Sequence, residues 1–396
     1  MMVQSYDVVV VGGGPAGSSA ARRAAGAGVS VLLVEKEPQI ATTVRTSGVT
    51  WSSSISEFGI PRRCYNPIKN YGFVSPNNKV VVRDRVSRAA VLDVRQTYRW
   101  LASEAEGAGA SILTGVPIRS ATRDGSGVLL EGAGGFSVRG RVVVDASGFA
   151  GAVAQSLGLA GPWRKFGAGA EYELHASNVD PETWWLMVGS MYSPAGYAWV
   201  FPVGGDLVRV GIGVAKPECA VDPKTLLDNM MRDKTGPVGD LGEVRVAEYH
   251  YGLIPNGGID RRSVYDNVIL VGDSAGQANP LVLEGIRYAI RFGGLAGETA
   301  AVAASGDASA ASLASYETGW RRAVESRIKS AYKVQDRWLA LTDTQWDEEL
   351  DTIRELSADE FLDFVKAEFG MSRILRLAVR HPRLAVRQLF GLVRPR

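Results

Sequence analysis

The hydrophobic pattern at the start of the chain predicts a strand, a helix and a second strand. Val8 to Val11 form a short apolar run, typical of a strand buried in a parallel sheet. A glycine-rich turn follows, and then an alanine-rich stretch that favours a helix. The run VSVLLVE returns as a second apolar strand and ends at Glu35. This order predicts a β-α-β unit with two parallel strands.

A different pattern occupies residues 193–202, SPAGYAWVFP. Tyr197, Trp199 and Phe201 alternate with smaller residues, and a period of two predicts a strand whose aromatic side chains share one face. The preceding stretch, ETWWLMVGSMYS, adds further large side chains, among them Trp185. So many large apolar residues favour a cavity for an apolar ligand. Ordinary sheet core remains an equally good interpretation of any one of them.

The glycines of the first turn follow the pattern GxGxxG at the point where the helix begins. Gly12 suits the tight turn, Gly14 the close approach of a pyrophosphate, and Gly17 the close packing of helix on strand. Free N–H groups at a helix start bind pyrophosphate. Glu35, at the end of the second strand, is placed to accept both hydroxyls of an adenosine ribose. Together they predict a site for FAD or NAD.

Two later segments favour FAD. Residues 142–159 run from a strand into Asp145-Ala146-Ser147-Gly148, and residues 267–301 run from a strand into Gly272-Asp273 and a long helix. A carboxylate at a strand end, beside a helix start, is well placed to hold ribityl hydroxyls. Gly285-Ile286 would bring backbone N–H groups near the pyrimidine side of a flavin. A lone Gly-Asp after a strand is often only a turn. Here its position matches that of the glycine-rich turn in the N-terminal β-α-β unit, which favours a cofactor site.

These motifs resemble FAD-dependent enzymes of the p-hydroxybenzoate hydroxylase fold. Within that group, YAWVFP followed by VRVGIG is similar to the geranylgeranyl reductase family, and LTDTQWDEELDTIREL with FVKAEF and HP resembles the C-terminal region of its archaeal lipid reductases. The resemblance covers nearly the whole chain and implies substrate contacts by Tyr197, Trp199 and Trp185. The residues expected at the cofactor are Gly12, Gly14, Pro15, Ala16, Gly17, Glu35, Lys36, Arg45, Thr46, Ser47, Arg95, Gly272, Asp273, Gly285 and Ile286.

The chain departs from the family pattern where the resemblance places the catalytic cysteine. The relatives carry VRCGEG, and this chain has VRTSGVTW, so Thr46 stands in the place of the cysteine. The TGGG of the relatives is VLEG at residues 282–285. The expected catalytic residues are therefore Thr46 and Tyr197, with water as an alternative proton donor. Arg95 lies where the fold has an arginine that contacts FAD, although a surface arginine at a helix start is an equally good interpretation.

Composition and charge narrow the class of protein. The chain has 396 residues, of which 46% are hydrophobic and 22% charged, typical of a globular protein. No apolar run reaches the ~18 residues of a membrane-spanning helix, and we expect no cleavable signal. Two distant cysteines and three scattered histidines predict no metal site and favour a reducing cytoplasm.

The net charge of +2 conceals a strong asymmetry near the C-terminus. Residues 341–370 are strongly acidic, and residues 371–396 carry seven arginines and no acidic residue. In the basic segment Val386, Leu389 and Phe390 follow helical spacing, which predicts an amphipathic helix on an anionic membrane surface. The alternative is a helix that docks on the acidic segment. Nucleic-acid binding is disfavoured, because no aromatic residues alternate with the basic ones.

We therefore predict an FAD-dependent reductase that saturates C=C bonds of a geranylgeranyl or polyprenyl chain, cytoplasmic and peripheral on the membrane. No second dinucleotide motif is found, so the expected electron donor is NADPH docking at the flavin, ferredoxin or another carrier, and the sequence does not choose among them. The alternatives are a flavin-dependent monooxygenase or halogenase on the same fold, and a flavin-binding electron-transfer protein.

The expected fold is mixed α/β, a Rossmann-like FAD-binding domain with an inserted mixed β-sheet substrate domain and a C-terminal helical region. The expected bounds are 1–65, 90–160 and 250–300 for the FAD-binding domain, 66–89 and 161–249 for the substrate domain, and 301–396 for the helical region.

Overall fold

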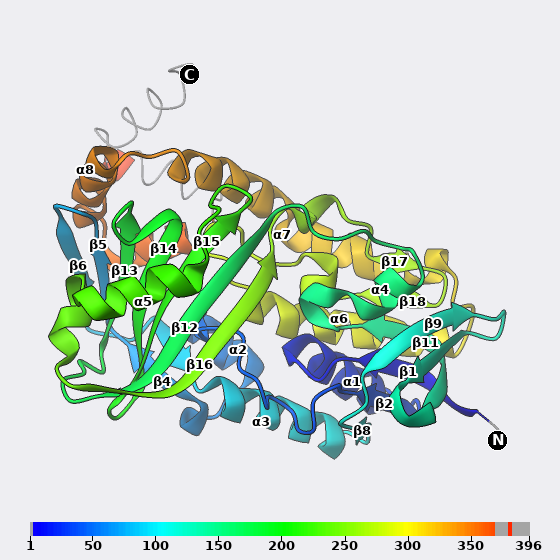
Figure 1. Ribbon diagram of the computed structural model, residues 1–396. Coiled ribbons are helices and arrows are strands. Elements are labelled where there is room, and N and C mark those ends of the chain that lie inside the picture. The colour runs from blue at the N-terminus through cyan, green and yellow to red at the C-terminus, as the bar shows by residue number, and fades with distance from the viewer. Residues whose placement is uncertain (1–2, 369–378, 382–396) are drawn as a thin grey trace.

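The computed structural model describes residues 3–368 and 379–381. Two large sheets lie side by side, an eight-stranded sheet on the right of Figure 1 and a seven-stranded sheet on the left. The long helix α7 (Ala310–Trp338) runs along the top of the molecule. The predicted mixed α/β class is confirmed. Most of the predicted amphipathic tail, residues 371–396, lies outside the described residues.

The eight-stranded sheet carries the predicted β-α-β unit. Its strands are β1 (Gln4–Val11), β2 (Val31–Val34), β8 (Ser111–Leu113), β9 (Ile118–Arg123), β10 (Val128–Gly132), β11 (Ser137–Asp145), β17 (Val264–Tyr265) and β18 (Val268–Leu270). The order is β17-β18-β11-β1-β2-β8, and β10 pairs with both β11 and β9. The five strands from β18 to β8 are parallel, whereas β17, β9 and β10 add antiparallel pairs.

The parallel strands are buried on both faces, as the apolar run in the sequence predicts. Val8 and Val10 pack on the face covered by helices α1 (Pro15–Gly26) and α6 (Ile286–Ala304). Val9 and Val11 pack on the opposite face, against a cluster that includes Val153 of the short helix α4 (Ala152–Ser156). The carboxyl ends of these strands then lead into the loops that the sequence assigns to the cofactor.

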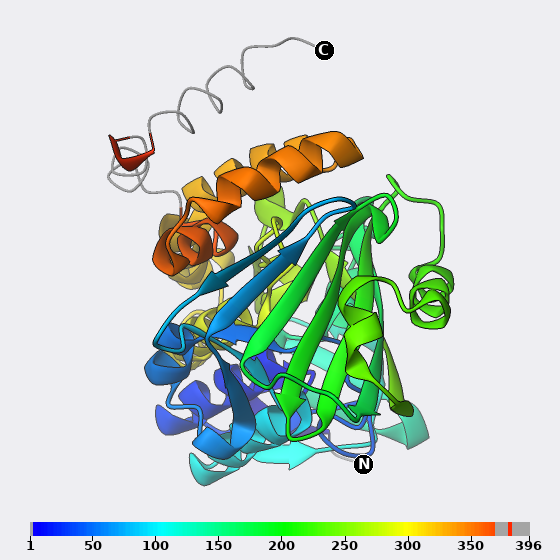
Figure 2. The same ribbon diagram turned by 90° about the vertical axis from the view of Figure 1, so that its left-hand side faces the viewer.

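The seven-stranded sheet is mixed, with one parallel pair among antiparallel ones. Its strands are β5 (Asn70–Val74), β6 (Lys79–Arg83), β12 (Phe166–Ala176), β13 (Thr183–Gly189), β14 (Ser193–Gly204), β15 (Leu207–Lys216) and β16 (Val244–Pro255). The order is β16-β12-β15-β14-β13-β5-β6, and the parallel pair is β13 with β5. Figure 2 shows this sheet with α8 (Asp343–Arg354) across its upper edge.

The two faces of this sheet bury different clusters. One face carries Trp184 and Phe201, which pack with Trp346 of α8 and Phe361 of α9 (Ala358–Val365). The other face packs against α5 (Pro223–Asp233) and includes Met187. Because successive side chains of a strand point to opposite faces, adjacent residues of the same strand belong to different hydrophobic clusters.

A third sheet has three strands. It includes both ends of segment 66–89, which was expected in the substrate domain. Its strands are β3 (Val49–Trp51), β4 (Tyr65–Ile68) and β7 (Ala89–Leu92), in the order β3-β7-β4. Of the predicted segment 66–89, residues 70–83 therefore supply the strands of the large sheet, and β16 extends that sheet beyond residue 249. The remaining α-helices among the described residues are α2 (Ser52–Phe58), α3 (Val94–Gly107), α4 (Ala152–Ser156) and α9 (Ala358–Val365).

Two glycines of α6 bring that helix into backbone contact with α1. A Cβ atom added at Gly293 would lie 2.3 Å from the Ala16 carbonyl oxygen, and one at Gly297 would lie 2.1 Å from that of Ala20. Such distances are far below van der Waals contact. The close approach fixes the start of α1, and with it the glycine-rich turn that precedes it.

We predict that Gly293→Ala destabilises the protein by about 1–3 kcal/mol, because α6 must move away from α1. The matched control is Gly294→Ala in the same helix. A Cβ there has its nearest neighbour at 3.5 Å, on the flexible Arg23 side chain, so helix propensity should make that variant neutral or more stable by up to about 1 kcal/mol. Urea unfolding of both variants checks this. Equal stability of the two would contradict the proposed contact.

Candidate active site

A cavity of about 470 Å³ lies between the loops of the eight-stranded sheet and the aromatic face of the seven-stranded sheet. Its two ends differ in chemistry. The loop end is lined by backbone and polar groups of Gly14, Pro15, Ala16, Arg45, Thr46, Ser47, Ala146, Gly148, Gly272, Asp273, Gly285 and Ile286. The other end is lined by apolar side chains that include Trp184, Leu186, Val188, Trp199, Phe201, Trp338, Leu341 and Trp346. One continuous space therefore joins the candidate cofactor loops to an apolar chamber.

The geometry of the three motif glycines agrees with the task expected of each. Gly12 has φ +108°, and a Cβ there would lie 2.3 Å from the Ala146 carbonyl oxygen. A Cβ at Gly17 would lie 1.9 Å from the Gly12 carbonyl oxygen. At Gly14, by contrast, nothing lies within 4 Å of that position. Gly14 thus leaves an open approach to the start of α1, and the other two allow close packing around it.

The start of α1 has the features of an anion-binding helix terminus. Gly14 is the N-cap residue and no side chain caps it, while Pro15 occupies the first turn. The first N–H groups of a helix have no partner within the helix, and they bind phosphate where no side chain satisfies them. Glu35 holds this turn in place, because its Oε2 accepts the Gly13 N–H at 2.6 Å and its Oε1 accepts the Glu37 N–H at 2.9 Å.

The two carboxylates that end strands of the large sheet have different environments. Asp145 is fully buried, and its oxygens accept hydrogen bonds from Ser147 and from the Ala154 N–H. Asp145 therefore shapes its own loop. Asp273 faces the cavity, and no described residue donates a hydrogen bond to its carboxyl. Burial raises the pKa of Asp273 to about 7. An unpartnered carboxyl in this place is well suited to ribityl hydroxyls.

These residues fit FAD. In such a complex the open N-terminus of α1 would hold the pyrophosphate, Glu35 would lie toward the ribose, and Asp273 would lie toward the ribityl chain. Gly285, the residue before α6, lies beside Asp273, since a Cβ there would be 3.5 Å from Asp273 Oδ1. The cofactor roles of individual residues are proposals that rest on this arrangement.

The aromatic strand lies where its alternation places it, and Tyr197 and Trp199 both line the cavity. The indole of Trp199 lies over two glycines of the neighbouring strand β15. A Cβ at Gly211 would lie 2.3 Å from its ring, and one at Gly213 would lie 3.4 Å away. The glycines of VRVGIG thus form a slot for this indole, which explains why the two motifs occur together.

The hydroxyl of Tyr197 is already committed to a hydrogen bond. It donates to the Val282 carbonyl oxygen at 2.6 Å, and burial raises the pKa of Tyr197. The next residue, Leu283, has φ 48°, a left-handed backbone that is strained for leucine. Tyr197 therefore anchors a strained loop at the cavity, and its hydroxyl is a poor acid.

Thr46 lies on the cavity wall, in a segment that buried arginine Arg209 holds in place. Arg209 Nη1 donates to the Ser47 carbonyl oxygen at 2.9 Å and to that of Leu92 at 3.0 Å. Arg45, next to Thr46, lines the cavity and also pairs with Glu37 at 2.6 Å. The segment 45–47 thus reaches both the cofactor loops and the substrate sheet.

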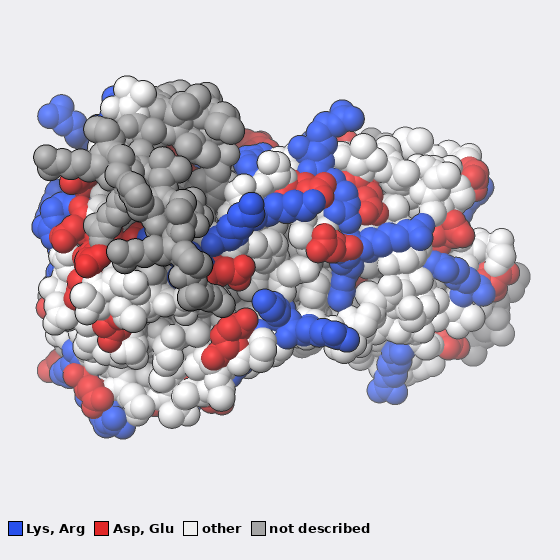
Figure 3. Space-filling view, turned by 90° about the horizontal axis from the view of Figure 1, so that it is seen from above, with Lys and Arg blue, Asp and Glu red and all other residues white. Residues whose placement is uncertain are grey.

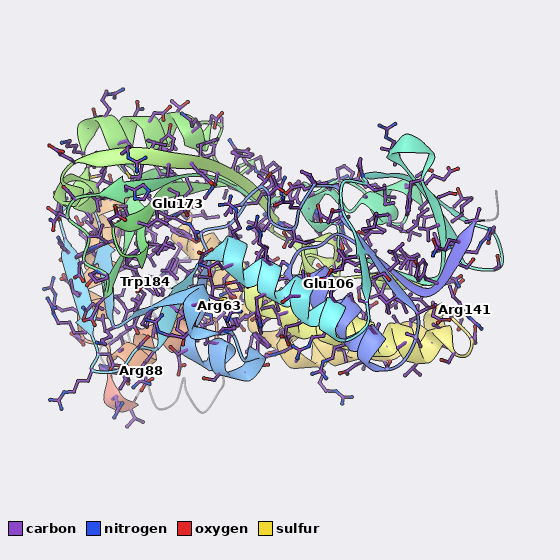
Figure 4. All side chains as sticks on the ribbon, turned by 90° about the horizontal axis from the view of Figure 1, so that it is seen from below. Arg63, Arg88, Glu106, Arg141, Glu173 and Trp184 are labelled. Atoms are coloured by element: carbon purple, nitrogen blue, oxygen red, sulfur yellow. The ribbon has the colours of Figure 1, made fainter. Side chains whose placement is uncertain are left out.

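Six expected contact residues lie outside the cavity lining: Gly12, Gly17 and Glu35, which shape the glycine-rich turn, and Trp185, Arg95 and Lys36. Trp185 points away from the cavity because Trp184, its neighbour on the strand, points into it, and the Trp185 ring contacts Gly72 and the Lys79 ammonium. Figure 4 shows Trp184 inside the part of the molecule that the seven-stranded sheet builds. Arg95 pairs with Glu248 at 2.9 Å, outside the cavity lining. Lys36 is exposed, also outside the cavity lining.

Two cavity residues were missed in the sequence, Glu171 and His250. Both have side chains that are 4% exposed, and they contact each other. The available signal was the pattern AEYELH in β12, where two carboxylates alternate inside an otherwise apolar strand. Charged residues at buried positions of a strand mark a functional or structural ion cluster. Among the described residues, no group of three or more His, Cys, Asp or Glu is placed to hold a metal ion.

Comparison with known proteins identifies the class. Residues 7–188 match the family of FAD dependent oxidoreductases, and residues 166–249 match the geranylgeranyl reductase catalytic domain. The chain is 33% identical to a digeranylgeranylglycerophospholipid reductase of Methanothermobacter thermautotrophicus, over 94% of this chain and 99% of that protein.

Two solved structures extend the comparison. A geranylgeranyl bacteriochlorophyll reductase-like protein of Thermoplasma acidophilum has a TM-score of 0.85 and 25% identity, covering 99% of this chain and 100% of that one. A flavin-dependent brominase has a TM-score of 0.69 and 19% identity, covering 96% of this chain and 99% of that one. The likeness to the brominase shows a shared fold alone.

The fold, the cavity loops and the family match define an FAD-dependent oxidoreductase. Its cofactor end is built from the loops of the eight-stranded sheet, and its other end is an apolar chamber. More narrowly, the chain belongs to the geranylgeranyl reductase family.

We predict that Asp273→Ala lowers the affinity of the protein for FAD by about tenfold to a hundredfold, because a hydrogen bond to a charged group contributes roughly 1.5–3 kcal/mol. Titration of the cofactor-free protein with FAD, followed by flavin fluorescence, measures this. The control is Glu106→Ala, which removes an exposed carboxyl of α3 and should leave the affinity unchanged. An unchanged affinity in Asp273→Ala would remove this residue from the cofactor site.

Proposed function

We propose that this protein saturates the C=C bonds of geranylgeranyl or related polyprenyl chains carried on a membrane lipid or a prenyl quinone. The observation that carries the proposal is the single cavity that joins the cofactor loops to a chamber of Trp, Leu, Val and Phe side chains. Such a chamber excludes water and suits a hydrocarbon chain better than a charged metabolite. The names of the relatives and of the matched catalytic domain support the same substrate class.

The chemistry divides between the cofactor and the protein. Reduced FAD supplies hydride when bound. The residues of this chain hold the alkene against the cofactor end, exclude water and provide a proton for the second carbon. We propose that Trp199 and Trp184 form the wall along which the chain lies, and that Thr46 and Ser47 hydrogen-bond the flavin or the substrate. Thr46 offers a hydroxyl where the family pattern has a thiol.

The donor of electrons to FAD is proposed to be NADPH or ferredoxin. The chain has one dinucleotide motif, and FAD occupies it in this proposal. Anaerobic mixing of the oxidised flavoprotein with NADPH, and separately with reduced ferredoxin, distinguishes them by bleaching of the flavin absorption.

The membrane surface is the proposed location of the enzyme, with the basic segment 371–396 as its contact. Among the described residues, no helix is long and apolar enough to cross a membrane. Arg380 lies 3.1 Å from Glu360 of α9, and His381 lies 3.4 Å from the same carboxylate. These contacts support the view that the acidic helices cover part of the basic segment until lipid is present.

The surface seen from above carries mixed charge. Figure 3 shows Lys and Arg interspersed with Asp and Glu on this face. On α7 several of these charges pair within the helix, as Arg321 does with Glu317 and Lys329 with Glu325. Mixed charge of this kind is typical of a solvated helix, so the proposed anionic-surface contact rests on residues 371–396 rather than on α7.

We predict that the dithionite-reduced protein, without oxygen, converts geranylgeranyl lipids to products heavier by about two daltons per saturated bond, since each bond gains a hydride and a proton. Mass spectrometry of the extracted lipids measures this. Bound FAD with unchanged phospholipids and quinones would contradict the proposal. Products that gain oxygen only in air would instead support the monooxygenase or halogenase alternative.

We predict that exchanging Arg373, Arg376 and Arg380 for Gln weakens binding to anionic vesicles by roughly a hundredfold, because each arginine near such a surface contributes about 1 kcal/mol. Cosedimentation with vesicles that contain phosphatidylglycerol measures this. The control exchanges the exposed Arg63, Arg83 and Arg85 in the same way. Equal loss of binding in both triple variants would show that the segment has no special role.

A further inference from the structure

A line of polar side chains crosses the otherwise apolar wall beside Trp199. The Trp199 Nε1–H donates to Glu171 Oε2 at 2.8 Å. Glu171 Oε1 lies 3.0 Å from His250 Nδ1, and His250 Nε2 lies 3.1 Å from Glu248 Oε2. Glu248 in turn pairs with Arg95 at 2.9 Å. The five side chains form one continuous series of hydrogen bonds.

The two ends of this series meet different environments. Glu171 and His250 line the cavity and their side chains are only 4% exposed. The side chain of Glu248 is 41% exposed. Glu171 and His250 are direct partners across the strands β12 and β16, so the connection is built into the sheet register. The series therefore leads from solvent to the cavity.

The contacts of His250 require a charged imidazole ring. Each of its two nitrogens faces a carboxylate oxygen, and a neutral imidazole can donate from only one of them. Burial lowers the pKa of His250, but the hydrogen bonds to Glu171 and Glu248 raise it more, and the pKa lies above its usual value of 6.5. Both contacts and the raised pKa therefore favour a ring that carries a proton on each nitrogen.

The charged groups around His250 come from four elements. Glu171 and Glu173 lie on β12, Glu248 lies on β16, Arg209 lies on β15 and Arg95 lies on α3. Arg209 Nε lies 3.7 Å from Glu171 Oε1, and the positive charge of Arg209 lowers the pKa of His250. Because arginine stays charged at all relevant pH values, these two cations give a constant background for the titration of His250.

Other cavity groups are less suited to give a proton to an alkene. The Tyr197 hydroxyl donates to a carbonyl, Glu284 pairs with Arg287 at 2.7 Å, and Asp343 accepts hydrogen bonds from Ser190. Thr46 carries an alcohol, which is a weak acid. Asp273 lies at the proposed ribityl position.

We propose that Glu248, His250 and Glu171 form a proton relay that supplies the cavity with the proton needed to reduce a C=C bond. This inference rests on the proposed function. His250 first passes a proton to the Glu171 carboxylate. The π electron pair of the alkene then takes that proton to form one new C–H bond, and the hydride supplied with the reduced cofactor forms the other. Glu248 then returns a proton from solvent to His250. Glu171 is the group that meets the substrate, and His250 and Glu248 act through it.

The variant that tests the relay is Glu171→Gln, which keeps the shape of the side chain and leaves it unable to take up and pass on a proton. The protein is reduced anaerobically and mixed with geranylgeranyl lipid, and flavin reoxidation is followed at several pH values. We expect reoxidation at least about 100-fold slower than in the unaltered protein, the usual contribution of a general acid. In the unaltered protein the rate should fall as pH rises through the pKa of His250, and Glu171→Gln should lose that dependence.

The matched control is Glu173→Gln, on the same strand and visible in Figure 4. Glu173 pairs with Arg209 at 2.8 Å but contacts neither His250 nor the cavity. It therefore reports the cost of weakening the buried ion cluster alone. Equal slowing in both variants, with an unchanged pH profile, would assign Glu171 a structural role and overturn the relay.

A second measurement does not depend on turnover. The sequence has three histidines, so the ring signals of His250 are assigned in NMR spectra by comparison with His250→Asn. We expect a lower pKa of His250 in Glu171→Gln, and also in Glu248→Gln, whose site is partly exposed and should tolerate the change. Unchanged pKa values would overturn the relay even if lipid is reduced. Lower pKa values in a protein that leaves every lipid unchanged would overturn the proposed function, and with it the destination of the proton.

Discussion

The seven-stranded sheet is joined to the loop beside Thr46 and to strand β7 by the buried guanidinium of Arg209, whose side chain is 2% exposed. It donates to the Ser47 and Leu92 carbonyl oxygens on the side of the cofactor loops, and it pairs with Glu173, with Glu171 also near, in the substrate sheet. Removing one partner from such a cluster typically costs about 3–5 kcal/mol, because a charge is left buried and uncompensated. One side chain thus ties the segment beside Thr46 to the sheet that carries the aromatic wall of the cavity.

Glycine has an equally local role in shaping this site, by removing a side chain where another group must lie. Gly14 leaves the start of α1 open, and Gly211 leaves a slot for the Trp199 indole. In both places a methyl group would change what the cavity can hold. The indole in its slot then directs its N–H to Glu171. The aromatic strand β14 and the glycine-containing strand β15 therefore act together to position the Trp199 indole.

Much of the fold could be predicted from the sequence because its signals are local. The apolar run Val8–Val11, the glycine turn and the acid at Glu35 define the β-α-β unit, and the alternation around Trp199 defines a strand with one aromatic face. The sequence predicts a substrate contact by Trp185, but the strand register turns its neighbour Trp184 toward the cavity instead. The direction of Arg95 depended on Glu248, far along the chain. The pairing of Glu171 with His250 also needs two strands brought together by the fold, and no local pattern contains it.

The position of the last described helices affects how the protein folds during its synthesis. Trp338, Leu341, Trp346 and Val365 line the apolar chamber, and the Arg287 guanidinium beside the cofactor loops donates to the Lys366 carbonyl oxygen. The last of the proposed cofactor residues is Ile286, whereas the chamber is closed by residues 338–365, which are made later in translation. A ribosome-bound chain that has already formed its nucleotide site would still expose the aromatic face of the substrate sheet. Exposed surfaces of this kind invite aggregation, so the apolar wall of the cavity needs protection in the nascent protein until the last helices cover it.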